Sequence, residues 1–184
     1  MFEMQEALLV LDIQKDYVGE TVKYSLHQQE IDLIIQRINK ISKKARSIGL
    51  PVIYIGNEFE KKLVSNIFHK LIGVKTTDGA RLDPRLSVVS DLYFPKNRRD
   101  ALTNIELRKF LQKHNVNHLN IVGLFAEGCV YKTALSAIKH HFTVTVIKDA
   151  VCASSETKKI KALQRMEEKG VELLGTKDIL NRLL

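Results

Sequence analysis

Hydrophobic residues follow two alternating patterns along the chain. Short uninterrupted apolar runs, such as Ala7 to Leu11 and Pro51 to Ile55, are typical of strands buried on both faces. Longer segments repeat apolar residues at helical spacing, as between Glu30 and Ile48, where Gly49 ends the pattern. These criteria predict strands at 7–11, 51–55, 92–94, 118–122, 143–147 and 171–174, and helices at 30–48, 63–71, 103–114, 126–140, 154–169 and near the C-terminus.

The order of these elements predicts the fold class. Strands that alternate with helices form a mostly parallel sheet, because right-handed crossovers place helices on both of its faces. We therefore expect a three-layer α/β/α architecture of about six strands, in a single domain over residues 1–184. Pro95 is expected to end the strand at 92–94, and Thr103 and Glu106 to form a capping box for the next helix.

The composition, 45% hydrophobic and 27% charged, is that of an ordinary globular protein and excludes a disordered or collagen-like chain. No apolar stretch approaches the roughly 20 residues that cross a bilayer. No basic-then-apolar leader opens the sequence, because Glu3 and Glu6 stand there. We expect a cytoplasmic protein without a membrane partner.

The charge balance raises the question of nucleic-acid binding, because 29 Lys and Arg against 21 Asp and Glu give a net charge of +8. The basic residues are scattered in short runs such as Lys43-Lys44 and Arg98-Arg99, without interleaved aromatic residues. That distribution favours a solvated surface. No nucleic-acid partner is predicted.

The chain has only two cysteines, Cys129 and Cys152, which do not form a Cys-x-x-Cys pair. This argues against a disulfide framework and leaves room for one reactive thiol. Cys152 follows the strand at 143–147, and we interpret it as a small buried hydrophobic residue. The alternative is a redox partner for Cys129.

Polar residues follow four of the predicted strands: Asp12, then Asn57 with Glu58, then Lys96, then the segment 123–129 that ends at Cys129. In a parallel sheet the carboxyl ends meet at one edge, where ligands bind. Taken singly, a loop-bonding aspartate, a solvated lysine and a buried cysteine are ordinary. Together they supply the base, cation and nucleophile of covalent catalysis. The predicted helix start at Cys129 would lower the pKa of its thiol.

Five stretches in this order match a known pattern: 8–17 (LLVLDIQKDY), 79–86 (GARLDPRL), 94–102 (FPKNRRDAL), 123–130 (GLFAEGCV) and 147–150 (IKDA). With them the chain resembles the isochorismatase-like cysteine hydrolase superfamily nearly from end to end. The resemblance implies that Asp12 is the general base, that Lys96 stabilises the carboxylate and the thiolate, and that Cys129 is the nucleophile.

The resemblance also implies features around this triad. It places a cis peptide at Leu124–Phe125, which would aim the Phe125 N–H, together with the Cys129 N–H, at the developing oxyanion. Family pockets are lined by residues that match Gln14, Tyr17 and Asn57. It further implies a homo-oligomer, either a dimer or a tetramer.

Two departures from the family pattern limit the substrate. Nicotinamidases of the family carry an Asp-x-His metal motif after the second strand, whereas residues 56–61 read GNEFEK and only His69 follows. We therefore predict no metal and no cofactor. Phe125 replaces a small residue and would shrink the pocket. The sequence predicts a hydrolase of a small amide or ureido compound that works through a Cys129 acyl-enzyme. The alternative is a non-hydrolytic oligomeric scaffold or redox-responsive binding protein.

Overall fold

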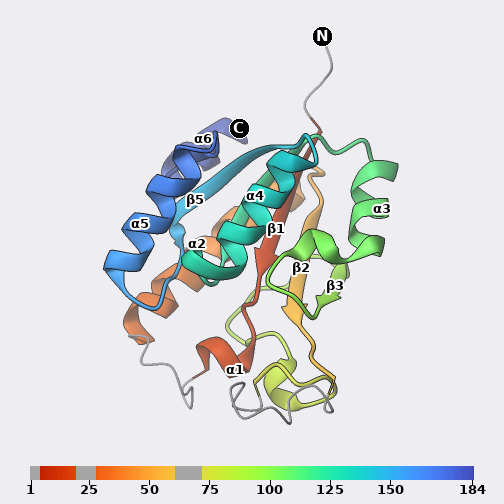
Figure 1. Cartoon of the computed structure of the whole chain (residues 1–184), viewed down its shortest axis with the longest axis vertical. Helices are drawn as coiled ribbons and strands as arrows, with labels where there is room; N and C mark the ends of the chain where they lie inside the picture. The colour runs from red at the N-terminus through yellow and green to blue at the C-terminus, as the bar shows by residue number, and fades with distance from the viewer. Residues whose placement is uncertain (1–4, 20–27, 61–71) are drawn as a thin grey trace.

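The protein was analysed as a computed structural model that describes residues 5–19, 28–60 and 72–184. The helix expected at 63–71 lies outside these residues. Within them, six strands form one sheet in the order β3-β2-β1-β4-β5-β6, and every neighbouring pair is parallel (Figure 1). The strands are β1 (Glu6–Leu11), β2 (Val52–Asn57), β3 (Tyr93–Lys96), β4 (His118–Gly123), β5 (Thr143–Val151) and β6 (Glu172–Leu174).

Helices cover both faces of the sheet (Figure 1). One face packs against α3 (Ile105–Lys113), α4 (Tyr131–Lys139) and α5 (Glu156–Glu167), and the other against α2 (Gln28–Ser47) and α6 (Thr176–Arg182). The predicted three-layer α/β/α architecture is thus confirmed. Short turns complete the chain: α1 (Lys15–Val18), which the pattern did not predict, 3₁₀ turns η1 (Asp78–Ala80) and η2 (Ala101–Thr103), and a π turn η3 (Ala126–Val130).

None of the helices in the described ranges is long and apolar enough to pass through a membrane.

The strand that was expected to end at Pro95 continues to Lys96. Pro95 lies within the strand and pairs with Gly56 of β2. In β3 the carbonyl of Lys96 faces β2 and accepts from Glu58 N at 2.7 Å, whereas the carbonyl of Pro95 faces outward and accepts from Asn104 Nδ2 at 2.6 Å. Because β3 is an edge strand, the missing N–H of Pro95 also points outward and removes no ladder bond. The prediction that Pro95 ends the strand was wrong, because a proline on the outer side of an edge strand does not interrupt the sheet.

The start of α3 also differs from the prediction. Thr103 ends the 3₁₀ turn η2, and the N-cap is Asn104, whose Oδ1 accepts from Glu106 N at 2.8 Å and Leu107 N at 3.1 Å. An asparagine caps at least as well as a threonine. The 3₁₀ turn moves the helix start by one residue. The N-cap of α5 is Ser155, whose Oγ accepts from Lys158 N at 3.3 Å.

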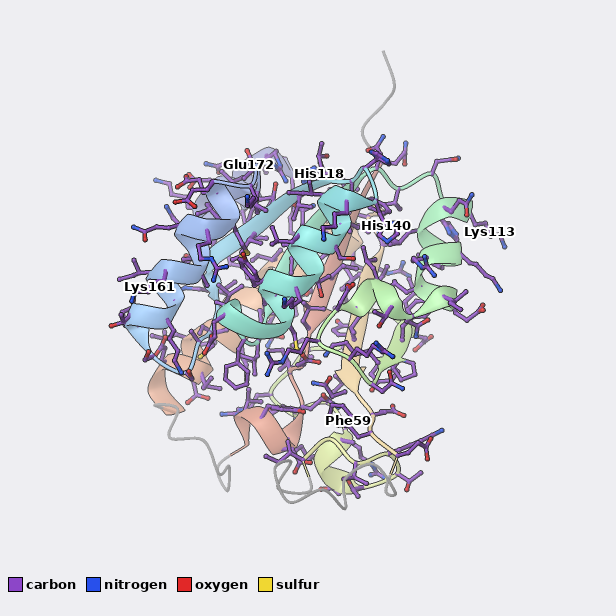
Figure 2. The ribbon with its side chains drawn as sticks, viewed as in Figure 1. Phe59, Lys113, His118, His140, Lys161 and Glu172 are labelled. Atoms are coloured by element: carbon purple, nitrogen blue, oxygen red, sulfur yellow. The ribbon has the colours of Figure 1, made fainter. Side chains whose placement is uncertain are left out.

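The amino-terminal ends of the strands hold a polar cluster, which we call the amino-end network (Figure 2 labels His118 and Glu172). Its members His118 and Asn120 are buried, whereas Glu6, Glu172 and Arg182 are partly exposed. Arg182 donates to Glu172 Oε2 at 2.7 Å and to Asn120 Oδ1 at 2.6 Å, and Asn120 Nδ2 donates to Glu6 Oε2 at 2.6 Å. Arg182 Nη2 also lies 3.3 Å from His118 Nε2, which must therefore accept, so the imidazole is neutral. This network fastens α6 to β1, β4 and β6.

Candidate active site

The candidate site lies where the strand order reverses. After β3, at one edge of the sheet, the chain crosses to β4 on the far side of β1. The carboxyl ends of β1 and β4 therefore flank a crevice of the kind in which open parallel sheets bind ligands. Asp12 follows β1, Lys96 ends β3 and Cys129 lies just after β4. The three residues that the sequence singles out thus come from neighbouring elements of one rim.

The Lys96 ammonium joins these residues. It lies 3.0 Å from Asp12 Oδ2 and 3.3 Å from Cys129 Sγ, and it donates to Asn57 Oδ1 at 2.6 Å. The Lys96 side chain is 0% exposed, so the ammonium makes these three contacts out of reach of solvent. The lysine is therefore not solvated, unlike most strand-end lysines.

Asp12 is buried in a strained backbone conformation. Its φ of +58° lies in the left-handed region, which aspartate tolerates better than most residues. It forms an ion pair with Lys96, and neither carboxylate oxygen has a hydrogen-bond partner of good geometry among the described residues. Burial raises the pKa of Asp12 above its ordinary value, against the opposing charge of Lys96 and weaker contacts with Cys129 and Asn57. A buried carboxylate with a raised pKa beside a thiol is suited to accept a proton.

Cys129 corrects two predictions about its surroundings. The segment 126–140 is not one regular helix, because η3 is kinked at Gly128 (φ −116°, ψ −106°) and α4 begins only at Tyr131. The cysteine therefore lies in a turn before the helix. Burial, together with the Asp12 charge, raises the pKa of the thiol to about 12, although Lys96 lowers it. The expected lowered pKa is wrong, because burial and the nearby carboxylate both disfavour the thiolate.

Gln14 and Asn57 lie in the rim, as expected, but their side chains are engaged with the protein. The Gln14 amide donates to the carbonyls of Asn57 at 3.0 Å and Ala80 at 2.6 Å, and its Oε1 accepts from Asn57 N at 2.8 Å. Gln14 is fully buried. The amide of Gln14 therefore fixes the end of β2. Asn57 in turn holds Lys96, a role that the sequence analysis missed and that the pairing of Asn57 with Lys96 across β2 and β3 explains.

Tyr17 and Phe125 pack against each other beside this cluster. Their ring centroids are 6.4 Å apart with the planes at 73°, an edge-to-face arrangement. Gly73, with φ +65°, passes between Tyr17 and Asn57, where a Cβ atom would lie 3.0 Å from the tyrosine hydroxyl and 3.2 Å from Asn57 Cβ. The structure thus brings all three predicted pocket residues, Gln14, Tyr17 and Asn57, to one rim.

The expected cis peptide at Leu124–Phe125 is absent, and the described residues hold no cis peptide. Leu124 N donates to Leu11 O at 3.0 Å and Ala126 N to Cys152 O at 2.7 Å, so the ends of two strands hold this stretch extended in the trans form. A non-proline cis bond costs roughly 3–4 kcal/mol more. The role of Phe125 and Cys129 N–H groups as oxyanion donors stays a prediction.

Two further features bear on cofactor and redox chemistry. In the part of the chain that the structure describes, no group of three or more His, Cys, Asp or Glu side chains is placed to hold a metal ion. His69 lies outside that part. Cys152 is buried, as predicted, and both cysteines are free thiols.

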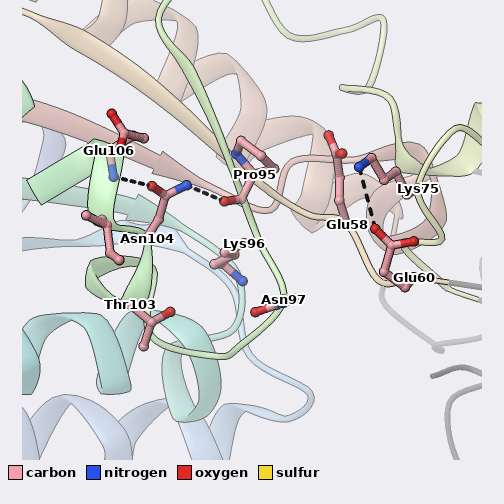
Figure 3. A pocket seen from close by; sticks show the side chains of 10 residues that line it. Glu58, Glu60, Lys75, Pro95, Lys96, Asn97, Thr103, Asn104 and Glu106 are labelled. Carbon is pink, nitrogen blue, oxygen red and sulfur yellow. Dashed lines mark hydrogen bonds and ion pairs between the residues drawn. The ribbon is translucent and has the colours of Figure 1, made fainter. Parts of the chain in front are cut away.

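A surface cavity of about 340 Å³ adjoins β3 from the outside (Figure 3). Its lining includes Glu58, Lys75 and Asn104, as well as Lys96. Because the Lys96 side chain is fully buried, the cavity meets only the main chain of that residue. The cavity therefore does not open onto the ammonium or the thiol.

The sheet order, the buried acid and cation and the half-buried thiol define an α/β protein with a cysteine-centred site at the carboxyl edge of its sheet. A family model for the isochorismatase domain matches residues 6–178, and the chain belongs to that family. It is 29% identical over 153 residues to the uncharacterised isochorismatase family protein YddQ of Bacillus subtilis (83% of this chain, 79% of the relative).

Two further similarities come from an enzyme and from a solved structure. The chain is 25% identical over 132 residues to an N-carbamoylsarcosine amidase of Arthrobacter (66% of this chain, 50% of that protein). The fold matches the crystal structure of an isochorismatase-like hydrolase from Alkaliphilus metalliredigens with a TM-score of 0.89 at 20% identity, covering 98% of this chain and 100% of the other.

Proposed function

We propose that this protein is a cysteine hydrolase that cleaves a C–N bond in a small amide or ureido compound through an acyl-enzyme on Cys129. The observation that carries the proposal is the contact of one buried ammonium, Lys96, with both the Asp12 carboxylate and the Cys129 thiol. That arrangement pairs a nucleophile with a base and holds a compensating charge between them. The similarity to an amidase that acts on an N-carbamoyl compound supports the substrate class.

The raised pKa values of Asp12 and Cys129 define how the first step proceeds. Cys129 Sγ attacks the carbonyl carbon as its proton passes to Asp12, so that no free thiolate precedes the attack. The step leaves the total charge of the cluster unchanged, because the carboxylate becomes neutral as the carbonyl oxygen becomes negative. Lys96 stays beside the reacting groups as the compensating cation. We assign the N–H groups of Phe125 and Cys129 as donors to that oxygen.

The remaining steps return the site to its starting state. Asp12 gives its proton to the leaving nitrogen, the C–N bond breaks, and an amine or ammonia departs from the acyl-enzyme. Asp12 then takes a proton from water, whose oxygen attacks the thioester carbon. The C–S bond breaks, the acid is released, and the proton on Asp12 returns to the sulfur.

The test is a panel of small amides, carbamoyl amines and ureido acids assayed for ammonia or amine release. We expect turnover of at least one compound, loss of turnover in Cys129→Ser, and an intact-mass increase equal to the acyl group when the reaction is quenched early. If no compound is hydrolysed by folded protein whose Cys129 is chemically accessible, the proposal fails. The non-hydrolytic scaffold or redox-responsive binding protein would then replace it.

A further inference from the structure

The Lys96 ammonium has a third partner besides the Asp12 carboxylate and the Cys129 thiol. It is the neutral side-chain amide of Asn57, which lies closest to the ammonium of the three. Asn57 Oδ1 lies 2.6 Å from the ammonium, against 3.0 Å for Asp12 Oδ2 and 3.3 Å for Cys129 Sγ. Asn57 and Lys96 are paired residues of adjacent parallel strands, so their side chains project from the same face of the sheet. The contact is thus built into the register of β2 and β3.

The Gln14 side chain bonds to both main-chain polar groups of Asn57. Gln14 accepts from the Asn57 N–H at 2.8 Å and donates to the Asn57 carbonyl at 3.0 Å. Gly56 makes this approach possible, because a Cβ atom there would lie 2.8 Å from Gln14 Nε2. Neither Gln14 nor Asn57 is more than 5% exposed. The Asn57 amide therefore has a fixed position relative to the ends of β1 and β3.

We propose that Asn57 is a positioning residue, which turns the Lys96 ammonium toward the Cys129 thiol, and that Gln14 holds Asn57 in place. The role in turnover rests on the proposed hydrolase function. The control of the thiol does not, because it can be measured without a substrate. Gln14 and Asn57 thereby act through Lys96, rather than as pocket residues that bind substrate.

The chemistry of the cluster explains why an amide suits this position. With Asn57 as a neutral acceptor, the ammonium has one anionic partner, Asp12, and one hydrogen left for the sulfur. Without that acceptor, a buried donor is unsatisfied and the ammonium moves toward the carboxylate, its strongest partner. The thiol then loses the cation that favours its anion.

The decisive experiment compares Asn57→Ala with Asn120→Ala. Asn120 is a matched control, because it is also buried and its Oδ1 also accepts from a cation, Arg182, at 2.6 Å, at the opposite end of the sheet. The rate at which methyl methanethiosulfonate modifies Cys129 is measured from pH 7 to 10 by intact mass, alongside thermal unfolding. Asn57→Ser, with a small hydroxyl acceptor, is a second variant in case the alanine variant does not fold.

We expect Asn57→Ala to slow the modification of Cys129 about tenfold, the loss that follows from one hydrogen bond to a charged group. Asn57→Ala and Asn120→Ala should lower the unfolding temperature by similar amounts. Only Asn57→Ala should change the rate at which Cys129 is modified. With a substrate in hand, Asn57→Ala should lower kcat and leave KM nearly unchanged. An unchanged modification rate in Asn57→Ala, or a raised KM with unchanged kcat, would overturn the proposal and make Asn57 a substrate contact. Failure to find any substrate would count against the hydrolase alone.

Discussion

Two polar clusters lie at opposite ends of the same sheet, one partly exposed and one buried, and they differ in how their carboxylates are hydrogen-bonded. In the amino-end network, the Arg182 guanidinium bonds to Glu172 and Asn120, and Asn120 bonds to Glu6. At the carboxyl end, the Lys96 ammonium has three partners, but both oxygens of Asp12 lack a hydrogen bond of good geometry among the described residues.

We interpret this difference as that between a structural cluster at the amino end and the proposed active site at the carboxyl end. At the amino end the carboxylates of Glu6 and Glu172 accept from Asn120 and Arg182, and the cluster stabilises the helix that it holds. A cluster that leaves a buried carboxylate incompletely bonded next to a thiol costs stability and keeps a proton acceptor ready. The left-handed backbone of Asp12 belongs to the same pattern, because strain of this kind gathers at functional sites.

The largest expected effect comes from Asp12→Asn. Turnover should fall about a thousandfold, because the variant lacks the general base that we propose. The Asp12 charge raises the pKa of the Cys129 thiol, so its removal lowers that pKa from about 12. Modification of Cys129 should therefore become faster at each pH, whereas the modification of Cys152 is the internal control and should not change. A slower reaction at Cys129 would show that Asp12 favours the thiolate.

A second expected effect distinguishes Lys96 from an ordinary surface cation. Lys96→Met should lower turnover about a hundredfold, because the cation that stabilises the developing negative charge is lost. Lys75→Met, which removes an exposed lysine 3.5 Å from Glu60, is the matched control and should keep full activity. Steady-state kinetics on both variants, with circular dichroism to check folding, decides the matter. Equal losses would remove any special role of Lys96.

At the other end of the sheet, Arg182→Met should have the opposite profile. We expect the free energy of unfolding to fall by about 2 kcal/mol, because Asn120 and Glu6 lose a charged donor. Turnover at 25 °C should stay within a factor of about two, since surface and distant changes act mainly on stability. Urea unfolding and activity assays on the same preparation test both statements. Lost activity without lost stability would contradict the division between the two clusters.

The smallest effect concerns pH. Burial lowers the pKa of His118 in the folded protein below its ordinary 6.5, and Arg182 adds to this against the charges of Glu6 and Glu172. The unfolded chain therefore binds a proton at His118 more readily, so stability falls as the pH drops below about 6.5. His118→Gln should reduce the fall in unfolding free energy between pH 7 and pH 5. Identical slopes for the two proteins would show that His118 does not contribute.

The fold was predictable because buried parallel strands are short uninterrupted apolar runs, which 7–11 and 51–55 show clearly. Element ends were harder to predict. Pro95 continues β3 because of its place at the sheet edge, and the cap of α3 shifts from Thr103 to Asn104 because of a 3₁₀ turn. The first depends on the position of β3 at the edge of the sheet, and the second on a 3₁₀ turn just before the helix. The spacing of apolar residues contains neither kind of information.

The sequence predicted which residues lie together at the rim, but not their electrostatics. Asp12, Lys96 and Cys129 each lie at or just after the end of a strand, so the topology brings them to one edge of the sheet. The pKa of Cys129 was expected to fall because the sequence shows a lysine and a helix start, whereas it shows neither the burial of the thiol nor its closeness to Asp12. The role of Asn57 depends on the register of β2 against β3, which the sequence does not specify.

Pro95 has a consequence for how the sheet meets its surroundings. An edge strand with free N–H and C=O groups is a template on which another chain can add a strand and begin aggregation. On β3 the outward position of Pro95 has no N–H to offer, and its carbonyl is taken by the Asn104 side chain. The strand that carries Lys96 therefore ends the sheet on that side. The same proline that continues β3 to Lys96 also protects the protein from edge-to-edge association there.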